Sequence, residues 1–139
     1  MVGWLLRVSK ITGVEEVKGQ EPSQELTPTI EPKKQGIKPD ENNYKAIVAK
    51  YFPDCPELAW QVVKKESGGN PNAHNFSHRT KDDSWGLFQI NRYGYLKTRP
   101  EPDKLVNAEF NIKYARGMYE ASGYTFKFHW KTTSNKLGL

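Results

Sequence analysis

The clearest hydrophobic pattern in the chain begins near residue 40. Apolar side chains then recur every three or four residues, which places them on one face of a helix. They are Tyr44, Ile47, Val48 and Tyr51. Asp40 stands where an N-cap is expected, and Phe52 with Pro53 forms a stop. The pattern predicts a helix between these signals.

A second helical stripe follows at once, over residues 54–67. Its apolar members are Leu58, Ala59, Val62 and Val63. Asp54 is positioned to cap this helix, with Pro56 in the first turn and Glu57 as the partner in a capping box. Gly68 and Gly69 end it, because glycine readily takes the left-handed conformation found at helix ends.

The remaining sequence predicts one more long helix. Residues 70–84 are polar and indicate a loop, and residues 85–91 form a short apolar segment that we expect to be extended. A helix is predicted from about Asn107 to Ser122, ended by Gly123. Its inward residues are Ile112, Ala115, Met118 and Tyr119. The aromatic residues beyond it are Tyr124, Phe126, Phe128 and Trp130. The fold class we expect is mainly α, with a short extended or hairpin segment.

The N-terminal part has a different composition. Residues 14–40 are rich in Pro, Glu, Gln and Lys and contain no aromatic residue, so they cannot bury enough apolar surface to offset their ordering entropy. We predict a disordered tail or linker over residues 1–40 and a folded domain over residues 41–139. Residues 1–13 hold no apolar run long enough for a membrane span or a complete signal peptide. We interpret residues 1–13 as a frayed terminus or as the remnant of an anchor.

Charge and cysteine content limit the classes of protein to which this chain can belong. The 139 residues carry a formal net charge of +5, and Cys55 is the only cysteine. A single cysteine excludes a scaffold held by intrachain disulfides and leaves a Cys-based zinc site short of ligands. The basic excess either draws an anionic partner, such as nucleic acid, anionic lipid or an acidic cell-wall polymer, or only keeps the domain soluble.

One residue breaks the apolar stripe of the second helix. Glu66 follows Val62 and Val63 by four and three residues, so it continues their face. Loss of hydration and the negative end of the helix dipole would both disfavour its ionisation. A carboxyl group that stays protonated near neutral pH can act as a general acid. The alternative is that Glu66 simply reaches into solvent from the last turn.

Three motifs around Glu66 carry a resemblance. They are ESGGNPNA at residues 66–73, SWGLFQIN at residues 84–91 and NAEFNI at residues 107–112. In this order and spacing, over about residues 42–131, the sequence resembles the lysozyme-like lytic transglycosylases of the SLT type. The resemblance implies a lysozyme-like fold and cleavage of peptidoglycan glycan strands without a metal or cofactor.

The resemblance also implies roles for individual residues. Glu66 matches the single catalytic acid/base of the family, and Ser67 matches the serine beside it, which orients backbone or substrate or only caps the helix. Gln89 matches a glutamine that lines the cleft. The other candidates for substrate binding are Ser84, Asn91, Asn111 and Tyr114. A buried amide at Asn111 would serve a structural bridge as readily as a sugar contact.

The sequence departs from a related pattern at Ser84. Animal-type lysozymes place an aspartate at this position, two residues before the glycine, whereas here Asp82 and Asp83 lie just upstream. A single carboxylate suits a transglycosylase, which forms 1,6-anhydro-N-acetylmuramic acid ends. The alternatives are a lysozyme-type hydrolase that uses Glu66 with Asp82 or Asp83, and a catalytically silent glycan-binding module. Longer family members carry a further Ala-Tyr-Asn motif that these 139 residues lack.

Other classes of site have weaker support. His74 and His78 are four residues apart but lie in the predicted loop, without the pattern of a zinc site. No sequence signature of a nucleic-acid-binding module is present. We therefore expect no metal, no cofactor and no nucleic acid, and a monomer that acts on peptidoglycan. The corresponding location is the cell envelope, the periplasm or the exterior of a cell, unless the protein is encoded by a phage.

Overall fold

The first described helix forms where the apolar spacing predicts it. The structure, a computed structural model, describes residues 40–139. Helix α2 (Glu41–Tyr51) is capped by Asp40, whose Oδ1 accepts the Asn43 N–H at 3.2 Å, and it ends at Phe52. Both predicted boundaries are confirmed. The tail predicted over residues 1–40 lies outside the described residues except for Asp40.

The second helix is confirmed, but its predicted cap is wrong. Helix α3 (Pro56–Ser67) buries Ala59, Val62 and Val63 and ends at Gly68 in the left-handed conformation, with φ +67°. Its N-cap is Cys55, which makes no side-chain capping hydrogen bond. Asp54 instead pairs with Arg116 on a later helix. With a guanidinium both partners are charged, whereas with a backbone amide only the carboxylate is, so the carboxylate takes the distant partner.

Residues 70–84, predicted as a loop, contain two strands. β1 (His74–Ser77) pairs antiparallel with β2 (Asp82–Trp85), and β2 pairs antiparallel with β3 (Ile90–Asn91), so the sheet order is β1-β2-β3. The loop prediction was wrong because both strands are short and mostly polar. The segment 85–91 is extended only at its two ends, with a turn between β2 and β3.

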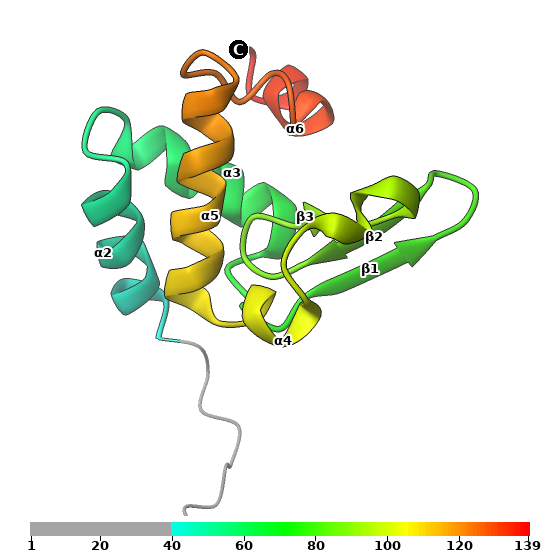
Figure 1. Cartoon of the computed structure of the whole chain (residues 1–139). Helices are drawn as coiled ribbons and strands as arrows, with labels where there is room; N and C mark the ends of the chain where they lie inside the picture. The colour runs from blue at the N-terminus through cyan, green and yellow to red at the C-terminus, as the bar shows by residue number, and fades with distance from the viewer. Residues whose placement is uncertain (1–39) are drawn as a thin grey trace, which may run out of the picture. The chain divides into compact units, whose positions relative to one another are not determined.

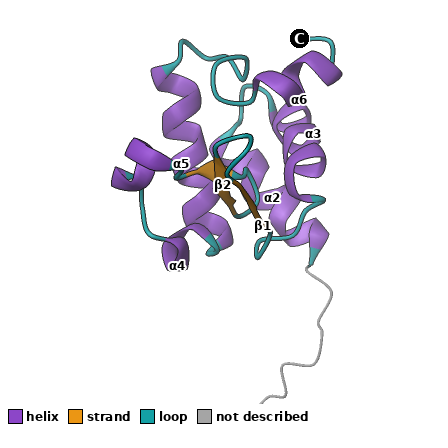
Figure 2. Cartoon of the chain, turned by 90° about the vertical axis from the view of Figure 1, so that its right-hand side faces the viewer, coloured by secondary structure: helices purple, strands orange, loops and turns teal. Residues whose placement is uncertain are grey.

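The C-terminal half returns to helices. After the 3-10 helix η2 (Gly94–Thr98) and the short α4 (Pro102–Leu105), α5 (Ala108–Ala121) begins at its cap Asn107, as predicted. Helix α6 (Lys131–Lys136), which has no apolar stripe and was not predicted, contacts α3 (Figures 1 and 2). The described part is thus mainly helical, with one three-stranded antiparallel sheet. None of its helices is long and apolar enough to cross a membrane.

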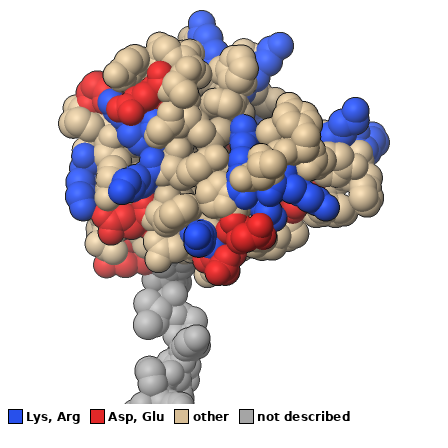
Figure 3. Space-filling view, viewed as in Figure 1, with Lys and Arg blue, Asp and Glu red and all other residues tan. Residues whose placement is uncertain are grey.

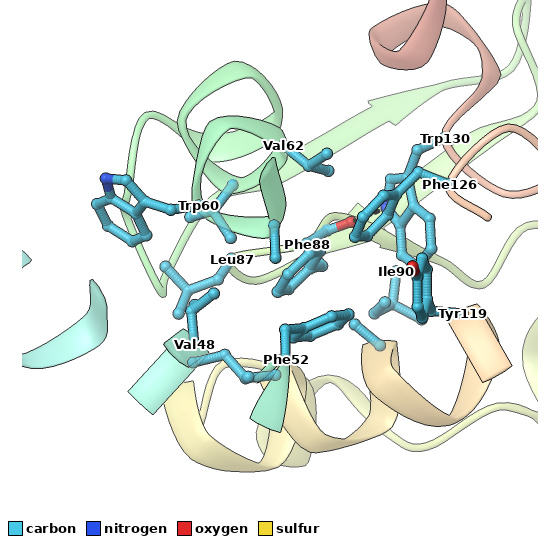
Figure 4. Close-up of a cluster of buried hydrophobic side chains, with 14 of the residues drawn as sticks. Val48, Phe52, Trp60, Val62, Leu87, Phe88, Ile90, Tyr119, Phe126 and Trp130 are labelled. Atoms are coloured by element: carbon cyan, nitrogen blue, oxygen red, sulfur yellow. Dashed lines mark hydrogen bonds between the residues drawn. The ribbon is translucent and has the colours of Figure 1, made fainter. Parts of the chain in front are cut away.

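Aromatic rings from three segments form the centre of the core (Figure 4). Phe52 stacks on Phe88 with 5.4 Å between ring centroids, and on Phe126 with 5.7 Å. Trp130 packs edge-on against Phe88 and donates its Nε1–H to the Phe88 carbonyl at 2.7 Å. This bond attaches the C-terminal aromatic segment to the turn between β2 and β3. Of the aromatic residues beyond α5, Tyr124 is exposed, as is Phe128.

Candidate active site

A cleft of about 260 Å³ opens where the end of α3, the sheet and the start of α6 meet. Glu66 lines it from α3, and Trp130 closes one side. The residues that the sheet and the turn before β3 contribute are Asn75, Asp82, Ser84, Gln89 and Asn91. His129, Lys131 and Thr132 complete the wall. The cleft therefore gathers side chains that are distant in the sequence around one carboxyl group.

Glu66 is held in a partly buried position at this cleft. Loss of hydration on burial is the largest cause that raises its pKa, and the negative charge of Asp82 raises it further. A hydrogen bond with Thr133 and the positive charge of Lys136, both on α6, oppose the rise. The net pKa is raised, so the protonated form of Glu66 persists to higher pH than for an exposed glutamate.

The pleat of the sheet separates the two candidate aspartates. Ser84 lies opposite Asn75 and Asn91, and Asp82 lies two residues before Ser84, so these side chains share the face toward the cleft. Ser84 donates its hydroxyl hydrogen to Asp82. Asp82, not Asp83, is thus the second carboxylate of the cleft.

Asp83 lies on the opposite face of the sheet. Its Oδ1 accepts the Trp85 Nε1–H at 2.8 Å and lies 2.9 Å from His74 Nε2. The rings of His74 and Trp85 stack with 3.6 Å between centroids, and Phe76 extends this row of rings along β1. Within residues 40–139, no group of three or more His, Cys, Asp or Glu side chains could hold a metal ion.

Gln89 lines the cleft and also stabilises its wall through hydrogen bonds. Its Nε2 donates to the carbonyls of Ala73 and Gly86, each at 3.0 Å, and its Oε1 accepts from Asn75 Nδ2 at 2.9 Å. Gln89 also has φ +48°, a conformation that costs a non-glycine residue about 1 kcal/mol or more. These bonds fix the turn that carries it.

Two further predicted residues make contacts within the protein. Asn91 Oδ1 accepts the N–H groups of Asp83 and Tyr93, at 3.2 and 2.8 Å, although its side chain still borders the cleft. Ser67 donates to the Val63 carbonyl and accepts the Gly69 N–H, each at 3.2 Å. Ser67 therefore closes the end of α3 and does not line the cleft.

Asn111 is a structural bridge. It is fully buried, and its Oδ1 accepts the Phe88 N–H at 2.8 Å. Its Nδ2 donates to the carbonyls of Trp85 and Leu105, at 3.0 and 2.9 Å. Because both ends of the amide are occupied, Asn111 connects α5 to the turn before β3 and to α4 and contacts no cleft.

Tyr114 lies outside the cleft of Glu66. It lines a second, larger cavity of about 510 Å³ along α5, which His129 borders as well. The sequence did not predict Asn75, His129, Lys131 or Thr132 as cleft residues, nor Thr133 as a partner of Glu66. The strand that carries Asn75 was read as a loop, and α6, which carries Thr133, has no apolar pattern to reveal it.

Comparison with known proteins gives no match. No protein-family model, curated protein or solved structure matches the chain. The function is therefore inferred from the residues of the cleft and from the motifs in the sequence.

Proposed function

We propose that this protein is a lysozyme-like lytic transglycosylase that cleaves peptidoglycan at the β-1,4 bond between N-acetylmuramic acid and N-acetylglucosamine. The observation that carries the proposal is Glu66, a carboxyl group with a raised pKa at the edge of an open cleft. The three sequence motifs support the same assignment, since residues of the first two border this cleft.

The proposed reaction uses Glu66 twice. Its proton goes to the glycosidic oxygen as the bond to the anomeric carbon breaks, which releases the 4-hydroxyl of N-acetylglucosamine. The resulting carboxylate then takes the proton of the muramoyl 6-hydroxyl while that oxygen bonds to the anomeric carbon. No water is consumed, and Glu66 ends protonated. The attacking hydroxyl belongs to the bound sugar, so it has a high effective concentration.

The position of Asp82 favours a second candidate, a lysozyme-type hydrolase. A carboxylate in the same cleft as the acid could activate water as a base. In the transglycosylase, Asp82 instead acts on Glu66 through its charge, by disfavouring ionisation of the acid before the bond breaks. The two candidates differ in their products, because hydrolysis gives reducing ends and the intramolecular route gives 1,6-anhydro ends that are one water lighter.

The test is mass spectrometry of the fragments that the purified protein releases from peptidoglycan. We expect predominantly 1,6-anhydro ends. Glu66→Gln should lower the rate about 10²–10⁴-fold, because glutamine is nearly isosteric but its amide is not acidic enough to protonate the leaving oxygen. Reducing ends would favour the hydrolase. Release of fragments by Glu66→Gln at the wild-type rate would exclude Glu66 as the acid, and binding without any cleavage by the wild type would indicate a silent glycan-binding module.

A matched control lies at the other end of the same helix. Glu57 is in the first turn of α3, is exposed, and pairs with Lys45 at 3.1 Å. Glu57→Gln makes the same chemical change away from the cleft, and exposed ion pairs contribute little to stability. It should therefore keep the wild-type rate, and circular dichroism should show that both variants are folded.

A further inference from the structure

The second cavity follows the outer face of α5. Its wall on this helix is formed by Phe110, Lys113, Tyr114, Gly117, Met118 and Ala121. These residues recur every three or four positions, so they form one face, next to the face that buries Asn111, Ile112, Ala115 and Tyr119. Met118, predicted to point inward, is half-buried and packs against the core from the edge of this groove, as Phe110 and Tyr114 do. Figure 3 shows an uncharged band down the middle of this side of the domain, with charged groups on either side of it. We call this cavity the α5 groove.

The α5 groove adjoins the cleft of Glu66. His129 lines both cavities, so the cleft and the groove lie next to each other at this side chain. The groove has a volume of about 510 Å³, within the range of small-ligand sites. Burial and the positive charge of Arg99 lower the pKa of His129, which favours the neutral ring. A neutral imidazole both donates and accepts a hydrogen bond, as a peptide group requires.

The chemistry of the groove suits a short anionic peptide. Its wall is largely apolar, and its polar groups are the Lys113 ammonium, the Tyr114 hydroxyl and the His129 ring. A sugar subsite would need more hydrogen-bonding groups to match the hydroxyls. Lys113 is exposed and forms no ion pair with any residue of 40–139, so its charge is available to a carboxylate.

We infer that the α5 groove binds the stem peptide carried by the N-acetylmuramic acid that occupies the cleft. This inference rests on the proposed function. The alanyl methyl groups of such a peptide match the apolar wall, and its free carboxylates pair with Lys113. The charges that line the cleft are mixed, since Lys131 borders it as well as Asp82, whereas Lys113 is the charged side chain among the residues that line the groove.

Gly117 offers a direct way to fill the groove. It lies in the exposed face of α5, and a Cβ built on it meets no atom within 4 Å. Gly117→Leu therefore adds a side chain beside the groove at a position that has room for a Cβ, and it improves helix propensity. Gly117→Ala improves the propensity in the same way but adds only a methyl group, so it is the matched control. Lys113→Gln removes the charge with little change in shape.

The experiment compares glycan strands that carry stem peptides with the same strands after removal of the peptides by an amidase. We expect the wild type to prefer peptide-bearing strands in kcat/KM by about tenfold, from apolar burial and one charge pair. Gly117→Leu should bring this ratio close to one, Lys113→Gln should lower it, and Gly117→Ala should retain it. Equal cleavage of both substrates by the wild type, or an unchanged ratio in Gly117→Leu, would overturn the inference and leave the proposed function standing.

A binding measurement separates the two proposals. The free stem tetrapeptide is titrated into isotope-labelled Glu66→Gln protein, and amide chemical shifts are followed by NMR. Shifts at Lys113 and Gly117 that are absent from Gly117→Leu support the groove even if no strand is cleaved, in which case only the proposed function fails. A titration without shifts on α5 overturns the groove whatever the cleavage assay gives.

Discussion

At the scale of single residues, the cleft pairs an acid with a nearby like charge. Burial and the charge of Asp82 act in the same direction on Glu66, while Thr133 and Lys136 act against them. The pKa of Glu66 thus depends on residues of the sheet and of α6 as well as on its burial at the end of α3. The pKa of Glu66 should therefore change when one of these neighbouring residues is substituted.

Asp82→Asn tests this coupling. In the proposed reaction Glu66 is the general acid and works in its protonated form, so activity should fall as the pH rises through its raised pKa. The substitution removes the like charge and lowers that pKa, so the alkaline limb of kcat/KM should move to lower pH while the products stay the same.

Asp83→Asn is the control, because Asp83 lies on the other face of the sheet. It should leave the alkaline limb in place. If Asp82→Asn instead removed activity at every pH, Asp82 would be acting as the base of a hydrolase.

At the scale of elements, α5 approaches the turn before β3 very closely at Gly86. A Cβ at Gly86 would lie 2.2 Å from Asn111 Nδ2 and 2.2 Å from the Leu105 carbonyl oxygen, and φ is +79°. Gly86→Ala should therefore destabilise the domain by about 3 kcal/mol or more, since it combines a backbone clash with an unfavourable φ and disturbs a buried amide. Urea unfolding measures this change.

Gly123→Ala separates the cost of the unfavourable φ from the cost of the clash. Gly123 has a similar φ of +84°, but a Cβ there meets no atom within 4 Å. This variant should lose only about 1 kcal/mol, the cost of a left-handed alanine. Equal losses for the two variants would show that the contact at Gly86 relaxes without cost.

The sequence predicts the helices in which apolar residues recur every three or four positions, and it does not predict the elements that lack such a pattern. Helices α2, α3 and α5 are confirmed because each buries one stripe of apolar side chains. Strands β1 and β2 are four residues each, and α6 is mostly polar, so their formation depends on tertiary contacts that no local pattern records. Asp54 was misassigned for the same reason, since its partner Arg116 lies far along the chain.

The site was predictable to the extent that its chemistry is local. Glu66 stands out as a carboxylate that continues an apolar face, and the cleft position of Gln89 follows from its motif. Asp82 and Asp83 could not be separated, because the alternation that distinguishes them exists only once β2 is known to be a strand. For Ser67 and Asn111 the sequence left an internal role and a substrate contact open, and the hydrogen bonds of the folded chain favour the internal role.

At the scale of the whole molecule, Lys38–Leu139 forms a compact unit with its own core. Every residue of the cleft and of the α5 groove belongs to this unit. A fragment that begins at Lys38 should therefore fold, melt within a few degrees of the full chain, and cleave soluble glycan strands at the same rate. Calorimetry of both proteins measures this, and a much lower melting temperature of the fragment would show that residues 1–37 contribute to the core.

The two-faced sheet restricts where the length of this protein can change. Asn75, Asp82 and Ser84 face the cleft, while His74, Asp83 and Trp85 form the opposite face. One residue inserted within β2 would exchange these faces and turn the wrong aspartate toward Glu66. Residues 78–81 connect the two strands and lie outside their pairing. Insertions and deletions in this connection should therefore leave the cleft intact. Within β1 or β2 they should disrupt the cleft, so natural selection should remove them.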